Sequence, residues 1–94
     1  MRGNMAYVYI LRSKKDRRLY IGSAKNLKNR IKEHINGLVL STKNRRPLLL
    51  IGWREFADIK NAALWEKKYK NSHGQLERDI KNSKIILYKH RHRV

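Results

Sequence analysis

The chain has 94 residues and no internal repeat, so it can hold one domain with one modest core. It carries 24 lysines and arginines against seven acidic residues, a formal net charge of +17, which makes nucleic acid the expected partner. The lack of cysteine excludes a disulfide scaffold and a cysteine-based zinc site, and no apolar run approaches the roughly 20 residues that span a bilayer. With no secretory signal and no long amphipathic helix that gathers the basic residues opposite an apolar face, we expect a cytoplasmic protein without a membrane partner.

The first elements of the chain predict a β-hairpin. Residues 6–11 form a continuous apolar and aromatic run, residues 13–18 are polar, and residues 19–21 form a second apolar run that ends at Gly22. Both runs are apolar on both faces, which is typical of central strands covered by helices on two sides.

A helix is predicted over residues 23–36. Its apolar residues recur every four positions, at Leu27, Ile31 and Ile35. Ser23 can cap the N-terminus, and Gly37 can stop the helix in a left-handed conformation.

The second half of the chain continues with a strand and a helix. A basic loop over residues 41–47 ends in Pro47, which introduces a third strand over residues 48–56 with Gly52 as a candidate bulge. Asp58 can cap a second helix that extends to about Lys70.

The last elements predict how the core closes. Gly74 interrupts the helical pattern, and a short helix follows with Leu76 and Ile80 facing inward. The apolar run 85–88 closes the core before a basic tail at 89–94, which we expect to be mobile. The chain thus predicts an α/β (α+β) fold with a small three-stranded antiparallel sheet flanked by helices. We expect a single domain over residues 1–94, with its core at about 6–88.

Glu66 breaks the pattern of its helix. The inward stripe reads Ile59, Ala62, Glu66 and Tyr69, and an ionised carboxylate is costly to bury without a cation or a metal ion as its partner. An ion pair with one of the many basic residues, or a helix rotation that leaves Glu66 at an edge, would explain this position without any function.

Other candidate residues have simple structural explanations when each is taken alone. Arg30 and His34 lie one turn apart on the first helix, as residues of a solvated face do. Tyr9 and Tyr20 lie in the hairpin strands, where tyrosine is common. Of the two tryptophans, we expect Trp53 in the core, and Trp65 is the candidate for stacking on a base.

Taken together, these residues resemble the GIY-YIG nuclease superfamily, and most closely its small stand-alone bacterial branch, over roughly residues 6–70. Five positions match the family pattern in order: Tyr9, Tyr20, Gly22, Arg30 and Glu66. The first motif reads Tyr7-Val8-Tyr9 instead of Gly-Ile-Tyr, and only its last position supplies a functional side chain. The match extends to the branch through His34, Gly37, Thr42 and the run Arg45-Arg46-Pro47.

The resemblance implies a role for each matched residue. Glu66 would bind one Mg²⁺ or Mn²⁺, and Arg30 would brace the phosphate oxygens. Tyr9, together with Tyr20 or His34, would orient and deprotonate the attacking water. Many family members also have an asparagine after the glutamate helix, for which Asn71 and Asn82 are both candidates.

We therefore expect a divalent-metal-dependent DNA endonuclease or nicking enzyme that hydrolyses phosphodiester bonds. DNA would contact basic residues of the two loops and the second helix, namely Lys14, Lys15, Arg17, Arg18, Lys43, Arg45, Arg46 and Lys70. The alternatives are a catalytically silent DNA- or RNA-binding module on the same fold and a structural RNA-binding protein of ribosomal type.

Overall fold

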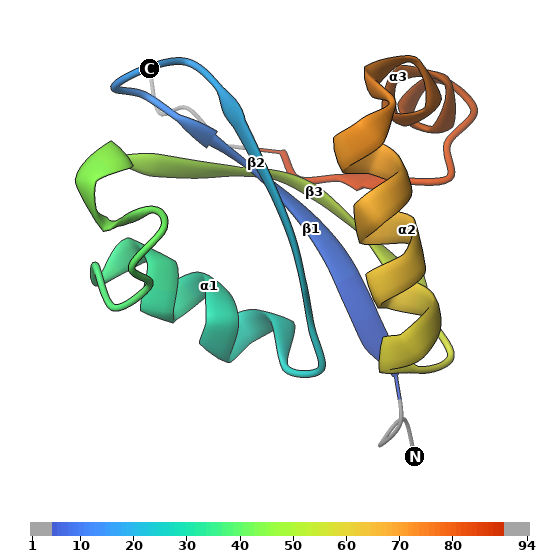
Figure 1. The fold of residues 1–94 in the computed structure, drawn as a ribbon, viewed down its shortest axis with the longest axis horizontal. Coiled ribbons are helices and arrows are strands. Elements are labelled where there is room, and N and C mark those ends of the chain that lie inside the picture. Colours follow the sequence, from blue (N-terminus) through green and yellow to red (C-terminus); the bar gives the residue numbers. More distant parts are fainter. Residues whose placement is uncertain (1–4, 90–94) are drawn as a thin grey trace.

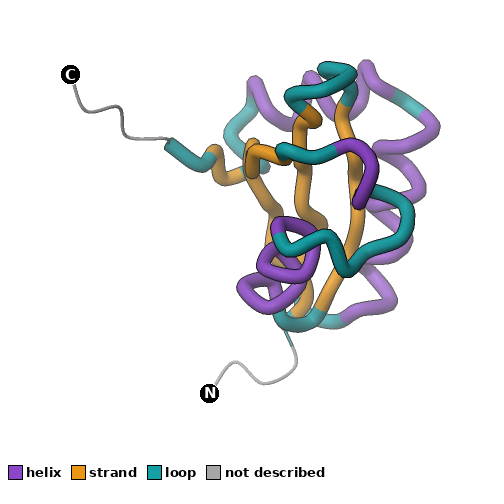
Figure 2. The backbone as a smooth tube through the Cα atoms, turned by 90° about the vertical axis from the view of Figure 1, so that its left-hand side faces the viewer, coloured by secondary structure: helices purple, strands orange, loops and turns teal. Residues whose placement is uncertain are grey.

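The computed structural model describes residues 5–89, so the predicted tail beyond Lys89 lies outside the described residues. One antiparallel sheet is formed by β1 (Ala6–Ser13), β2 (Leu19–Ala24), β3 (Leu48–Phe56) and β4 (Ile86–Leu87). Helix α1 (Leu27–Ile35) covers one face of this sheet, and α2 (Ile59–Asn71) and α3 (His73–Lys81) lie on the other, as Figures 1 and 2 show. The mixed fold with an antiparallel sheet agrees with the prediction. The number of strands does not, because the sheet has four and not three.

Strand β1 runs through the middle of the sheet, since the strand order is β2-β1-β3-β4. Its neighbouring residues Tyr9 and Ile10 point to opposite faces, and both are buried, so the strand is covered on two sides as predicted. Strand β2 was also predicted to be central, but it lies at the edge of the sheet, where Tyr20 is only half-buried. This edge brings the hairpin tyrosines close to the surface.

Helix α1 begins later than predicted. Ser23 does not cap it, because Ser23 belongs to β2 and is paired with Val8. The N-cap is Asn26, whose side-chain oxygen accepts a hydrogen bond from the backbone N–H of Asn29. The predicted stop is confirmed, since Gly37 follows the helix with a φ of +77°.

Strand β3 has the predicted bounds, and its register explains Gly52. Ile10 is paired with Gly52 and Leu11 with Leu50, so Ile51 is the extra residue of a bulge. A Cβ on Gly52 would lie 2.5 Å from the carbonyl oxygen of Ile86, so glycine is needed here for β4 to approach.

Helices α2 and α3, on the face of the sheet opposite α1, are separated by Ser72. Asp58 caps α2 as predicted, and Ser72 caps α3, so the chain breaks at Ser72 and not at Gly74, which lies inside α3. The main core lies between these helices and the sheet and is formed by Ala6, Val8, Ile10, Ile21, Ala62, Tyr69, Leu76 and Ile85. No helix within residues 5–89 is long and apolar enough to span a membrane.

Candidate active site

The candidate site is built around Tyr9, which lies opposite Gly22 in the pairing of β1 with β2. Because Gly22 has no side chain, the ring of Tyr9 lies against its backbone, and a Cβ there would come within 2.6 Å of the ring carbon Cζ. The ring is almost fully buried, at 1% exposure. The glycine of the second motif therefore makes room for the tyrosine of the first.

A buried chain of hydrogen bonds holds the Tyr9 hydroxyl. This oxygen lies 2.8 Å from His34 Nε2, and His34 Nδ1 lies 2.7 Å from Thr42 Oγ1. His34 and Thr42 have no exposed surface. Burial, with the nearby charge of Arg30, lowers the pKa of His34 to about 4. The imidazole is therefore neutral at physiological pH, with one ring nitrogen donating and the other accepting.

The phenol of Tyr9 is a weak acid in this environment. Burial raises its pKa to about 12, and the negative charge of Glu66 adds to this effect, while the Arg30 guanidinium opposes it. Arg30 also donates to Glu33 at 2.8 Å, and this bond, followed by the interaction with Tyr9, raises the pKa of Arg30. A permanent cation thus lies beside the phenol oxygen.

Tyr20 completes the aromatic part of the site. Its ring centroid lies 5.1 Å from that of His34 and 6.3 Å from that of Tyr9. Its hydroxyl accepts a hydrogen bond from Ser41 Oγ at 3.4 Å. Tyr20 is therefore attached to the loop that follows α1, while Tyr9 is attached to the helix itself.

Glu66 approaches from α2, on the opposite face of the sheet. Its Oε1 accepts a hydrogen bond from Ser23 Oγ on the edge strand at 2.5 Å, and its Oε2 is paired with Lys70 Nζ at 2.7 Å. The Glu66 side chain keeps 22% of its surface exposed. The carboxylate thus has both a hydrogen-bond donor and a cation, so its position does not by itself require a metal ion.

The donor set around Glu66 fits a weakly held, hydrated metal ion. Residues 5–89 contain no cluster of three histidine, cysteine or acidic side chains that would enclose a metal. Mg²⁺ typically keeps several waters and is held by one or two carboxylates together with substrate phosphates. One carboxylate at the open edge of the sheet meets that requirement, provided that Lys70 releases Oε2.

The two predicted basic loops meet in one surface. Ser13 Oγ donates to the carbonyl of Arg45 at 2.6 Å, and the backbone N–H of Lys14 donates to the carbonyl of Pro47 at 2.8 Å. Arg45 also donates to Asp16 at 2.8 Å, and this bond lowers the pKa of that carboxyl to about 2. The remaining cations of this surface are exposed, namely Lys14, Lys15, Arg17, Arg18, Lys43 and Arg46.

Some predicted DNA contacts have other partners in the structure. Arg45 is occupied by Asp16, and Lys70 is occupied by Glu66. Arg46 donates to the carbonyls of Lys43 and Ile35. Lys15 Nζ also donates to the carbonyl of Asn44. These side chains stabilise the loops and the carboxylate, so the exposed Lys14 and Lys43 are the better candidates for phosphate contacts.

Sequence reasoning missed three partners of the site. The branch pattern includes Thr42 but implies no role for it, Ser23 has the side chain of a helix cap, and no motif marks Glu33. Only the hydrogen bonds to His34, Glu66 and Arg30 identify them. The two candidates for the family asparagine are both exposed. Asn71 is the last residue of α2, and Asn82 is the C-cap of α3.

Comparisons with known proteins identify the family and the fold of the chain. The family model of the GIY-YIG catalytic domain matches residues 5–82. The solution NMR structure of the UPF0213 protein BH0048 from Bacillus halodurans is similar, with 30% sequence identity, a TM-score of 0.51 and 85% of each chain covered. A search among curated proteins found no significant match.

Proposed function

This chain belongs to the GIY-YIG family of nuclease domains, and on that premise we propose that it is a divalent-metal-dependent DNA endonuclease or nicking enzyme. The observation that carries the proposal is the buried bond between Tyr9 and His34 at 2.8 Å, with Arg30 beside the phenol. Any buried tyrosine hydroxyl needs a hydrogen-bond partner, as that of Tyr69 has in Arg54 and Asp79. The hydroxyl of Tyr9 differs in having a neutral histidine as its partner together with a guanidinium. Both are useful if the phenol oxygen must exchange a proton with water next to a phosphate.

In this proposal Tyr9 is the general base. Its hydroxyl donates to His34 Nε2, and His34 Nδ1 donates to Thr42, so the phenol has one fixed orientation. The Arg30 guanidinium favours the phenolate, because it opposes the effect of burial on the pKa of Tyr9. Once the phenol has lost its own proton to solvent, the phenolate takes a proton from the attacking water. Tyr20 packs against His34 and limits movement of the ring.

Arg30 and Glu66 would interact with the scissile phosphate. Arg30 Nη1 donates one hydrogen bond to Glu33, so other N–H groups of the guanidinium are left to bind the non-bridging oxygens of the phosphate. Glu66, supported by Ser23, would hold the Mg²⁺ or Mn²⁺ together with waters and phosphate oxygens. Such an ion supplies Lewis-acid polarisation of the scissile phosphate.

The competing candidate is a catalytically silent DNA- or RNA-binding module on the same fold. The ion pair between Glu66 and Lys70 favours it, because the carboxylate is already satisfied without a metal. A structural RNA-binding protein of ribosomal type would explain the net charge of +17 but not the buried Tyr9–His34 pair.

The deciding experiment is a cleavage assay on single-stranded, duplex, branched and flapped DNA with Mg²⁺ or Mn²⁺. We expect cleavage by the wild type and loss of most of the rate in Tyr9→Phe. Tyr69→Phe is the matched control, since Tyr69 is also a buried tyrosine with a pKa raised to about 12 by burial, on the far side of the sheet. Binding without cleavage of any substrate would select the silent module.

A further inference from the structure

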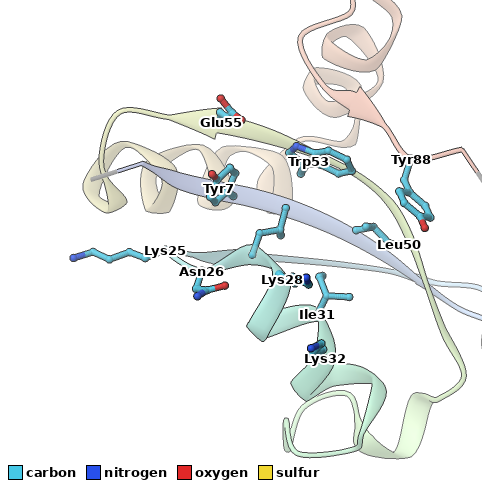
Figure 3. Close-up of a pocket in the computed structure, with 11 residues that line it drawn as sticks. Tyr7, Lys25, Asn26, Lys28, Ile31, Lys32, Leu50, Trp53, Glu55 and Tyr88 are labelled. Atoms are coloured by element: carbon cyan, nitrogen blue, oxygen red, sulfur yellow. The ribbon is translucent and has the colours of Figure 1, made fainter. Parts of the chain in front are cut away.

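A concave feature lies on the α1 face of the sheet. An open pocket of ≈ 540 Å³ lies between the start of α1 and the strands β1 and β3, and Tyr88, just after β4, also lines it (Figure 3). Its volume is in the range of about 300–1,000 Å³ that is usual for small-ligand sites. The residues that give it chemical character are Tyr7, Trp53, Tyr88, Lys25, Lys28 and Lys32.

We propose that this pocket binds an unpaired base of a single-stranded segment of the nucleic acid on which the candidate active site acts. The inference rests on the proposed function and adds a substrate class to it. Bases in an intact duplex are stacked and cannot enter a pocket of this kind, so single-stranded, flapped or branched substrates are selected over plain duplex.

Aromatic rings supply the stacking surface. Tyr7 and Trp53 come from neighbouring strands, and both are only partly buried, so part of each ring remains open to a ligand. The Trp53 and Tyr88 ring centroids lie 6.3 Å apart. Stacking on rings of this type is tolerant of sequence, because every base has a flat π-face.

This assignment reverses the expectation for the two tryptophans. Trp65 packs against the core, where its ring is stacked on that of Phe56 with the Arg54 guanidinium 4.4 Å from its centroid. Lys68 lies 4.3 Å from the same centroid. Trp65 is partly buried, as Trp53 is, but its ring already contacts Phe56 and two cationic side chains. Trp53 is therefore the better placed of the two for a base.

Charge on the rim of the pocket fits a polyanion. Lys28 and Lys32 are four residues apart on one side of α1, and Lys25 precedes the N-cap Asn26. All three are exposed, and none forms an ion pair with a residue in the described range 5–89. Glu55 is the acidic residue of the lining, so three positive charges stand against one. The rim suits the phosphates on either side of a bound base.

The pocket and the candidate active site share two elements. Tyr7 and Tyr9 point to the same face of β1, about 7 Å apart along the strand. On α1, Arg30 and His34 contact the active-site tyrosine, while Lys28 and Lys32 line the pocket. One strand of nucleic acid can therefore present a phosphate to Tyr9 and an unpaired base to Trp53.

Fluorescence of Trp53 tests the proposal directly. In a Trp65→Phe protein, Trp53 is the sole tryptophan and reports on the pocket. The titration uses oligothymidylate and an abasic oligomer of the same length, in EDTA so that no cleavage occurs. We expect oligothymidylate to quench the emission and to bind about tenfold more tightly than the abasic strand, which offers phosphates without bases. Equal binding of the two oligomers with unchanged emission would overturn the proposal.

A substitution supports the same test. Trp53→Leu should weaken binding of oligothymidylate about tenfold and leave binding of the abasic strand unchanged. An equal loss for both strands would show that the residue acts on the fold or the charge and not on the base. If this variant does not fold, the fluorescence titration with Trp53 intact still decides the question.

The outcomes also separate this inference from the proposed function. Metal-dependent cleavage without base-dependent binding would reject the base-binding pocket and support the nuclease function. Base-dependent binding without cleavage in the presence of any metal would support the base-binding pocket and reject the nuclease function.

Discussion

The phenol oxygen of Tyr9 lies 2.5 Å from the position that a Cβ on Gly22 would occupy. A methyl group at Gly22 must therefore displace the ring and, with it, the oxygen that is bonded to His34 at 2.8 Å. We predict that Gly22→Ala lowers the cleavage rate about a hundredfold, because a shift of about 1 Å at a reacting group has an effect of that size. Overpacking should also lower the free energy of unfolding by about 1–3 kcal/mol. Rate measurements and chemical denaturation of the same preparation check both values.

The matched control for this variant is Gly74→Ala. A Cβ on Gly74 meets nothing closer than 3.5 Å, so it fits without movement inside α3. This change should leave the cleavage rate unaltered and stabilise the helix by up to about 1 kcal/mol. Unchanged activity in Gly22→Ala would show that the position of the Tyr9 ring does not matter for the reaction.

The pH dependence of cleavage identifies the base. Since burial raises the pKa of Tyr9 to about 12, the phenolate fraction should increase about tenfold for each pH unit across the neutral and mildly alkaline range. We expect the logarithm of the rate to rise with a slope near one. A base at His34, whose pKa is lowered to about 4, would instead give a flat profile above about pH 5. Single-turnover rates at saturating enzyme distinguish the two.

Protein stability should report the buried histidine independently of catalysis. The pKa of His34 is lowered from 6.5 to about 4 in the folded protein, so the unfolded chain binds a proton first as the pH falls. The contribution of neutral His34 to the free energy of unfolding is fully present above pH 6.5. It is lost as the pH falls from 6.5 to 4, and the loss is up to about 3 kcal/mol. We predict that His34→Gln loses this part of the pH dependence and that His73→Gln, at an exposed histidine, keeps it. Urea unfolding at several pH values measures the difference.

The bounds of β3 and α2 could be predicted because the signals are local. Pro47 and Asp58 act on their own neighbours, and the structure agrees with both assignments. The start of α1 could not be decided in the same way, because Ser23 and Asn26 are both good N-caps. The pairing of Ser23 with Val8, a contact distant in sequence, excludes Ser23.

The fourth strand and the polar contacts of the site could not be predicted either, because they too depend on contacts between residues distant in sequence. Residues 85–88 were predicted to close the core, but of these residues Ile85 alone is buried, and Ile86 and Leu87 are each 49% exposed. Ile86 and Leu87 form a strand because Gly52 lets the backbone approach. Likewise, the positions of Tyr9 and Arg30 followed from a family pattern. The partners of Glu66, which are Ser23 and Lys70, depend on how α2 packs against the sheet edge. Side-chain pairing of that kind is not encoded in local spacing.

Binding should depend strongly on salt because the surface charge is high. If about six phosphates are neutralised, the logarithm of the affinity falls with the logarithm of salt concentration at a slope of roughly −4 to −5. Lys14→Ala with Lys43→Ala should reduce this slope by about two, since both side chains are exposed at the joined loops. Lys60→Ala with Lys81→Ala, exposed on α2 and α3, should leave it unchanged. Equal effects of the two pairs would mean that nucleic acid binds without a preferred face.

The most direct test of the account is the metal dependence of cleavage by Glu66→Gln. The Lys70 side chain is 49% exposed, so losing its ion pair with Glu66 should cost less than about 1 kcal/mol of stability. We predict that this variant folds and binds DNA as the wild type does, yet cleaves none at any Mn²⁺ concentration, whereas Glu77→Gln, at an exposed glutamate of α3, cleaves normally. Cleavage by Glu66→Gln with the metal dependence of the wild type would contradict the assignment of Glu66 as the metal ligand and, with it, the proposed mechanism.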